Sequence, residues 1–136
     1  GGGREVLVGM VEDPLFGPLV VFGLGGVYVE LMKDVAFRIN PLTDLDVDSL
    51  IADVKTARLL EGYRGSEPGD IPALRELLLR LSVMIDHIPE IAEMDLNPVK
   101  VLEPGEGAIV VDSRIRVRKI EGAMLPSRKD VPGRLL

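Results

Sequence analysis

The sequence predicts an α+β fold, with a mostly antiparallel sheet of about five strands and two helices on one of its faces. Three stretches near the start of the chain are rich in Val, Ile and Phe, as strands are. Two stretches in the middle repeat apolar residues every three or four positions, as amphipathic helices do. Two strand-like stretches follow, so helices and strands are segregated along the chain, which is typical of α+β proteins.

The three early strands are expected at residues 4–11, 19–22 and 35–41. The first is apolar on both sides, as in a central strand with both faces covered. Between the second and the third lies a run with three glycines in four positions, which includes Gly25 and Gly26. Such a run fits either a strained connector or a loop that lies against a ligand. We take Gly25 and Gly26 as cofactor-binding candidates.

The two helices are expected at residues 45–60 and 70–88. Aspartates near the start of the first helix favour the positive end of its dipole. Asp70 can begin the second helix, and Pro72 fits its first turn. His87, the only histidine in the sequence, falls at the end of the second helix. We assign it a capping or surface role rather than a catalytic one.

Residues 91–117 are expected to form the last two strands as a hairpin. Glu93, Asp95 and Asn97 alternate with apolar residues, so these three side chains should share one face of the sheet. Pro98 cannot donate a hydrogen bond to a neighbouring strand, which indicates a sheet edge or a strand irregularity there. The apolar residues of the alternation would face the core.

The position of the turn decides which side chains of the hairpin meet. If the hairpin is centred on residues 104–105, Asn97 lies opposite Asp112 and Asp95 lies opposite Arg114. An amide oxygen and a carboxylate on opposed residues can bind one hard cation such as Mg²⁺, which leaves positions for water and phosphate. We therefore take Asn97 and Asp112 as metal ligands. The other interpretation is an ordinary hairpin with a solvated acidic face, and a one-residue slip would turn Asp112 to the other face.

The composition excludes several classes of protein. The chain has 136 residues, and we expect a single domain over residues 1–136, with an ordered core at 4–117 and an irregular tail at 118–136. The absence of cysteine excludes disulfides and Cys-based zinc sites and fits a reducing compartment, so we expect a cytoplasmic protein. A net charge of −6 argues against broad binding to nucleic acid or to anionic membranes. No apolar run reaches membrane-spanning length.

Six strings occur in order over residues 4–117: VGMVEDPLFGP, FGLGGVYVE, DVAFRINPL, LLEGYRG, EMDLNP and VVDSRI. In this combination the chain resembles the C-terminal lobe of the ATP-grasp domain of ADP-forming acyl-CoA (acetyl-CoA) synthetases, β-subunit type, which are related to the succinyl-CoA synthetase β subunit. The resemblance implies that Asn97 and Asp112 hold the Mg²⁺ of a bound ATP or GTP. It places Asp95 close to the phosphoryl transfer, as a catalytic candidate. Arg114 is a cofactor-binding candidate that lies either against phosphate or against Asp95.

The reaction of this family converts a nucleoside triphosphate, a carboxylic acid and CoA to acyl-CoA, the diphosphate and phosphate. A phosphohistidine on another domain or subunit carries the phosphoryl group, and His87 does not match it. The resemblance thus implies a preceding ATP-grasp lobe and a CoA-binding or phosphohistidine domain, in a multidomain chain or a hetero-oligomer. The chain alone should not turn over. The alternatives are a non-catalytic nucleotide-sensing or assembly module, for example in an acetyltransferase fusion, and a plain structural domain.

Overall fold

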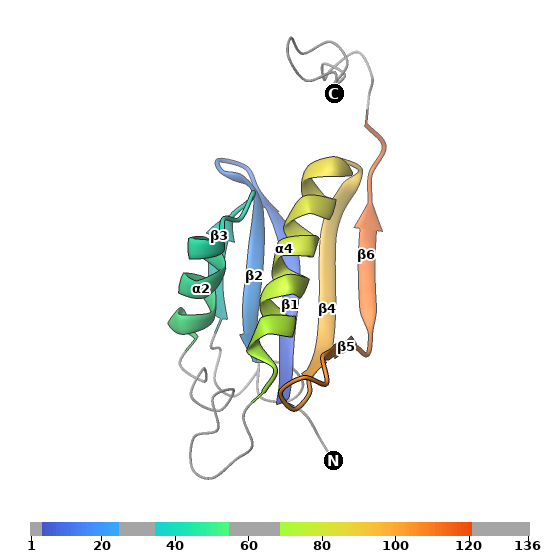
Figure 1. Ribbon diagram of the computed structural model, residues 1–136. Coiled ribbons are helices and arrows are strands. Elements are labelled where there is room, and N and C mark those ends of the chain that lie inside the picture. Colours follow the sequence, from blue (N-terminus) through green and yellow to red (C-terminus); the bar gives the residue numbers. More distant parts are fainter. Residues whose placement is uncertain (1–3, 25–34, 55–68, 121–136) are drawn as a thin grey trace, which may run out of the picture.

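The structure is a computed structural model that describes residues 4–24, 35–54 and 69–120 (Figure 1). In these ranges the chain forms a six-stranded sheet and two helices. The elements follow in the order β1 (Arg4–Asp13), β2 (Gly17–Leu24), β3 (Val35–Ile39), α2 (Asp44–Asp53), α4 (Ile71–His87), β4 (Ile91–Val101), β5 (Ala108–Val110) and β6 (Ser113–Val117). This order confirms the predicted α+β class, with the last predicted strand divided into two.

The strands of the sheet lie in the order β3-β2-β1-β4-β5. β5 pairs with the C-terminal end of β4, and β6 pairs with the N-terminal half of β4. All the strand pairs of the described part are antiparallel. β1 is central, as predicted, because β2 and β4 pair with its two edges. Both described helices lie on one face of the sheet, as predicted (Figure 1). On the other face of β1, Leu7 and Val11 are only half-buried, so the expectation that this strand is covered on both faces is wrong for the described residues.

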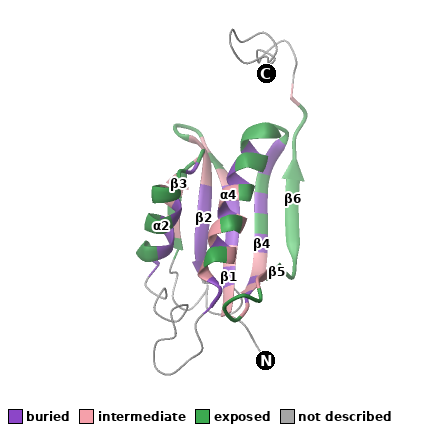
Figure 2. Ribbon diagram, viewed as in Figure 1, coloured by how far each residue is buried: buried purple, intermediate pink, exposed green. Residues whose placement is uncertain are grey.

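The core lies between the sheet and the two helices (Figure 2). The side chains that are fully inaccessible to solvent come from three strands and from both helices: Val8, Val20, Phe22, Val47, Leu50, Leu74, Leu78, Val99 and Val101. In β4, Met94 and Leu96 are buried whereas Glu93 and Asp95 are exposed. The period of two that the sequence shows therefore separates a core face of β4 from a polar face, as predicted.

Helix α2 begins with a capping box. The Thr43 hydroxyl oxygen accepts a hydrogen bond from the Asp46 N–H at 3.1 Å, and the Asp46 carboxylate accepts one from the Thr43 N–H at 2.9 Å. The bond from the Thr43 N–H to the carboxylate, helped by the Thr43 hydroxyl, holds the pKa of Asp46 below its ordinary value. The helix ends before Val54, whose backbone is extended. The prediction of one continuous helix over 45–60 is therefore wrong, while residues 55–60 themselves lie outside the described residues.

Helix α4 agrees with the predicted range to within one residue at each end. Asp70 is its N-cap and Pro72 lies in its first turn, both as predicted. His87 is exposed, and its Nδ1 lies 2.9 Å from the Val83 carbonyl oxygen, so it closes the end of the helix. Neither described helix is long and apolar enough to cross a membrane.

Candidate functional site

The hairpin formed by β4 with β5 and β6 carries the predicted site. Asp95 pairs with Arg114 across β4 and β6, and the Asn97 N–H donates a hydrogen bond to the Asp112 carbonyl oxygen at 3.1 Å. β4 and β5 continue in the same register towards the turn. These pairs confirm the predicted register, which sets Asn97 opposite Asp112 and Asp95 opposite Arg114.

The turn of this hairpin explains why the register agrees although the loop is longer than two residues. The Glu106 N–H donates to the Glu103 carbonyl oxygen at 2.9 Å, and Gly105 has a φ of +85°, as position three of a type II turn requires. Beyond this turn, the Leu102 N–H donates to the Gly107 carbonyl oxygen at 2.9 Å. The loop is thus extended equally on both sides of its centre, so the residue pairing does not change.

β4 departs from regular pairing at Asn97 and Pro98. On the β1 side, the single residue Leu7 lies across from both of them, which is a β-bulge. On the other side, β5 ends and β6 begins around Asp112. Pro98 has no N–H to donate, so the hydrogen-bond ladder is weakened at this point and the partner strand divides across from it. Pro98 therefore marks a strand irregularity and not an edge, and Asn97 and Asp112 face each other at the interruption.

Charged side chains line the exposed side of the hairpin. Glu93 and Arg116 form an ion pair, with 3.3 Å between Oε2 and Nε, and both are more than half exposed. The next pair along, Asp95 and Arg114, is directly opposed, yet in the described ranges no ion pair joins these two side chains. Of the two contacts considered for Arg114, the one with Asp95 is therefore not made here.

The proposed ligands are few and accessible. Asn97 is half-buried, whereas Asp112 is exposed. Across residues 4–24, 35–54 and 69–120, no three Asp, Glu or His side chains converge as a metal-binding cluster would. Two oxygen ligands from the protein, with the others from phosphate and water, would still suit Mg²⁺, which keeps much of its hydration shell in proteins. Gly25 and Gly26, the cofactor-binding candidates, lie outside the described residues.

Comparison with known proteins identifies the family. The model of the ATP-grasp domain matches residues 1–117. The chain belongs to the ATP-grasp family. It is 52% identical over 114 residues to the β subunit of an ADP-forming acetate–CoA ligase II of Pyrococcus furiosus, covering 83% of this chain and 48% of that subunit. It is 54% identical over 115 residues to an ADP-forming acetate–CoA ligase I of Archaeoglobus fulgidus, covering 84% of this chain and 16% of that protein.

A solved structure shows the same arrangement. The dinucleotide-forming acetyl-coenzyme A synthetase 1 of Ca. Korarchaeum cryptofilum, in complex with coenzyme A and Mg-AMPPCP, superposes with a TM-score of 0.81 at 49% identity. The match covers 87% of this chain and 55% of that chain. The resemblance seen in the sequence motifs and the ATP-grasp fold are thereby confirmed. The chain spans about half the length, or less, of each of these relatives.

Sequence reasoning missed the part that Asp70 plays in this ATP-grasp domain. One carboxylate oxygen accepts from the Ala73 N–H at 3.2 Å and caps α4. The other accepts from the N–H groups of Gly105 and Gly107, at 3.0 and 2.8 Å. The bonds from Gly107 and Ala73 hold the pKa of Asp70 below its ordinary value, so the group stays a charged acceptor. The cap was visible in the sequence, but nothing local to Asp70 points to the distant hairpin loop.

Sequence reasoning also missed Gly9, which lies opposite Asp95 on β1. A Cβ atom built there would come within 2.5 Å of the Met94 carbonyl oxygen. The two central strands of the ATP-grasp domain therefore approach too closely for any side chain at this position. A glycine inside an apolar strand was the available signal, because such a glycine often marks a close backbone approach.

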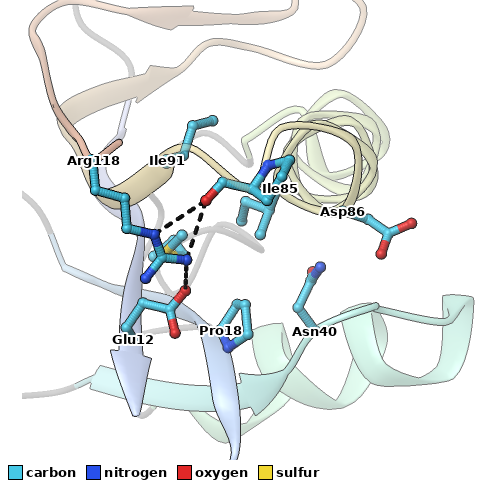
Figure 3. A pocket seen from close by; sticks show the side chains of 9 residues that line it. Glu12, Pro18, Asn40, Ile85, Asp86, Ile91 and Arg118 are labelled. Atoms are coloured by element: carbon cyan, nitrogen blue, oxygen red, sulfur yellow. Dashed lines mark hydrogen bonds and ion pairs between the residues drawn. The ribbon is translucent and has the colours of Figure 1, made fainter. Parts of the chain in front are cut away.

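A pocket of about 360 Å³ lies at the C-terminal end of α4 (Figure 3). Its lining includes the apolar Met10 and Ile85 and the charged Glu12, Asp86 and Arg118. None of the predicted site residues in the described ranges lines this pocket. The predicted site on the hairpin and this pocket are therefore made by different residues.

Proposed function

We propose that this chain is the Mg²⁺- and nucleotide-binding lobe of an NDP-forming acid–CoA ligase. Such an enzyme interconverts ATP (or GTP), a carboxylic acid and CoA with ADP, phosphate and acyl-CoA. The observation that carries the proposal is the opposition of Asn97 and Asp112 on one hairpin of an ATP-grasp domain. About half of its aligned residues are identical to those of proteins named as ADP-forming acetate–CoA ligases, which supports the same activity here.

The proposed roles follow from the chemistry of phosphoryl transfer, in which alignment and charge neutralisation matter most. Asn97 and Asp112 would bind Mg²⁺ through one oxygen each. When bound, the metal neutralises phosphate oxygens and fixes their alignment. Arg114, opposite Asp95 on the same hairpin, would place its guanidinium against phosphate. Asp95 would then orient or polarise the incoming phosphohistidine.

The remaining parts of the reaction belong elsewhere in the protein. We propose that Gly25 and Gly26 bring backbone close to the nucleotide, and that a preceding lobe completes the ATP site. A CoA-binding and phosphohistidine domain would be supplied in the same chain or by another subunit. One relative is named as a β subunit and another extends far beyond the match, which supports both arrangements. We place the protein in the cytoplasm. No observation favours a non-catalytic sensing or assembly module.

The test is a Mg²⁺ titration of ligase activity in the full-length protein, with wild type, Asn97→Ala and Asp112→Ala compared after folding is checked. Each variant should require at least about tenfold more Mg²⁺ for half-maximal rate, because each removes one of two protein ligands. The double variant should be much less than additive, since the first loss already opens the site. His87→Ala, at a helix end away from this face, should behave like wild type.

Two outcomes would contradict the proposal. If Asn97→Ala and Asp112→Ala both fold and titrate like wild type, the metal assignment is wrong, and Glu93 and Asp95 become the next pair to examine. If the full-length wild type binds ATP but forms no acyl-CoA from a panel of carboxylic acids, the protein is a nucleotide-binding module instead of a ligase.

A further inference from the structure

The segment that carries Asp112 and Arg114 has little packing of its own. We call residues 108–117, which comprise β5, β6 and the break between them, the arm. From Ile109 to Val117 every residue of the arm is exposed. Among the described residues the arm pairs only with β4, so its outer edge is open. A strand held along one edge, without a buried face, opens locally at low cost in free energy.

One end of the arm is fixed by Asp70, which is 7% exposed. Its carboxylate accepts hydrogen bonds from Gly105 and Gly107, directly before the arm begins. Its own N–H donates to the carbonyl oxygen of Leu102 at 2.7 Å, at the end of β4. Charge-assisted bonds of this kind are roughly twice as strong as neutral ones. They fasten the hairpin loop to the N-terminus of helix α4, which packs one face on the core.

The other end of the arm is fixed by Arg118 (Figure 3). Its guanidinium donates from Nη2 to the Glu12 carboxylate at 2.8 Å, and from Nε and Nη2 to the Pro89 carbonyl oxygen at 3.2 and 3.1 Å. Its backbone N–H donates to the Glu90 carbonyl oxygen at 2.8 Å. One side chain thus joins the end of the arm to β1 and to the turn between α4 and β4.

We propose that Asp70 and Arg118 are positioning residues that pin the two ends of the arm and thereby hold Asp112 opposite Asn97. Asp112 lies between the two fixed ends, at the interruption where the ladder itself is weakest. The pinning follows from the contacts alone. Its consequence for Mg²⁺ rests on the proposed function. The recorded bonds of Asp70 and Arg118 hold the segments on either side of the arm, so both residues would act on Asp112 through the backbone of the arm.

The first test measures hydrogen exchange of the Asn97 and Val111 amides, which bond across the interruption to Asp112 and Pro98. Asp70→Asn has one acceptor oxygen and therefore cannot both cap α4 and bind the loop. It should speed exchange of both amides at least about tenfold. Arg118→Lys, which loses the forked guanidinium, should do the same. If Asp70→Asn folds poorly, Asp70→Ser takes its place, because its hydroxyl still caps the helix but cannot reach the loop as well.

Two matched controls separate pinning from general destabilisation. Thr43→Ala removes the N-cap of the other helix, which has no bond to the hairpin. Arg80→Lys alters an exposed ion pair with Glu76 on the surface of α4. Both should leave exchange at Asn97 and Val111 unchanged. If the Asp70 and Arg118 variants also leave those amides at wild-type rates, or if the controls speed them equally, the arm is not pinned as proposed.

The second test measures the Mg²⁺ needed for half-maximal activity in the full-length protein. Asp70→Asn and Arg118→Lys should raise it about tenfold, the effect typical of residues that support metal ligands, with the rate at saturating Mg²⁺ largely kept. If Asn97→Ala and Asp112→Ala alter the Mg²⁺ response but Asp70→Asn and Arg118→Lys do not, the proposal that Asp70 and Arg118 position Asp112 is overturned. If none of the four alters it while the two positioning variants still speed exchange, the metal assignment fails and the pinning stands.

Discussion

The centre of the sheet and the arm share strand β4, but they are stabilised in different ways. On the β1 side, β4 packs its core face against the helices, and residues such as Val8 and Val99 are fully inaccessible to solvent. On the arm side, Ile115 and Val117 are half exposed or more, and side-chain hydrogen bonds at the two ends replace packing. The candidate site lies at the border, with Asn97 on the packed strand and Asp112 on the arm. Folding and metal binding should therefore respond to different substitutions.

The largest expected effect comes from the packed side. Phe22→Ala removes a fully buried ring between the sheet and the helices, so it should lower the free energy of unfolding by about 3–5 kcal/mol. Chemical denaturation followed by circular dichroism measures this. A loss below about 1 kcal/mol would mean that the centre of the sheet is no better packed than the arm.

A smaller effect, of a different origin, is expected where β1 and β4 approach each other. Gly9→Ala places a methyl group against the Met94 carbonyl oxygen, which belongs to backbone and cannot move aside easily. We expect a loss of about 1–3 kcal/mol, as for other overpacked sites. The same denaturation experiment measures this loss. Gly107→Ala is not a suitable control, because Gly107 has a positive φ and an alanine there would add backbone strain of its own. Wild-type stability in Gly9→Ala would show that the two strands can separate without loss.

The Asp70 carboxylate, which connects the packed side to the arm, should make a pH-dependent contribution to the free energy of unfolding. Its folded-state pKa is lowered, chiefly by the hydrogen bond from the Gly107 N–H. Its stabilising contribution is therefore complete above the ordinary aspartate pKa of about 3.9 and is lost as the pH falls through the lowered folded-state value. The difference in free energy of unfolding between wild type and Asp70→Asn should shrink over that acidic range. Urea denaturation at several pH values measures it, and a constant difference would contradict the assignment.

The smallest effect is expected on the arm itself. Ile115→Ala truncates a side chain that is 50% exposed and lies on an open-edged strand. The free energy of unfolding should change by no more than about 0.5 kcal/mol, as for other surface substitutions. A change as large as that of Phe22→Ala would show that the arm is covered in the folded protein, and the contrast between the two regions would disappear.

The sequence was sufficient for those features that depend on local pattern. The alternation of Glu93 and Asp95 with apolar residues predicted the polar face of β4, and the proline and glycine of the hairpin turn predicted its register. The start of α4 at Asp70 was also predictable, because a capping residue and an early proline mark it locally. In each case the decisive interaction lies within a few residues of the pattern that signals it.

The features that the sequence did not predict depend on partners far along the chain. The strand division around Asp112 follows from Pro98 on the opposite strand, since the run of valines before Asp112 is strand-like by itself. The second role of Asp70 depends on a loop that only the folded hairpin brings near. The end of α2 at Val54 is a third case, because apolar spacing continued past it and gave no stop signal.

The position of β1 between β2 and β4 also has a consequence for how the chain folds. β2 follows β1 directly, but Gly9 meets its other partner at Asp95, after both helices have been passed. Closing so long a loop is slow compared with forming a local hairpin. During synthesis, β1 must therefore wait with one edge unpaired until β4 has emerged, and an apolar strand with an open edge is prone to pair with other chains. The step most exposed to aggregation is thus the docking of β4 onto β1, long before a nucleotide can bind.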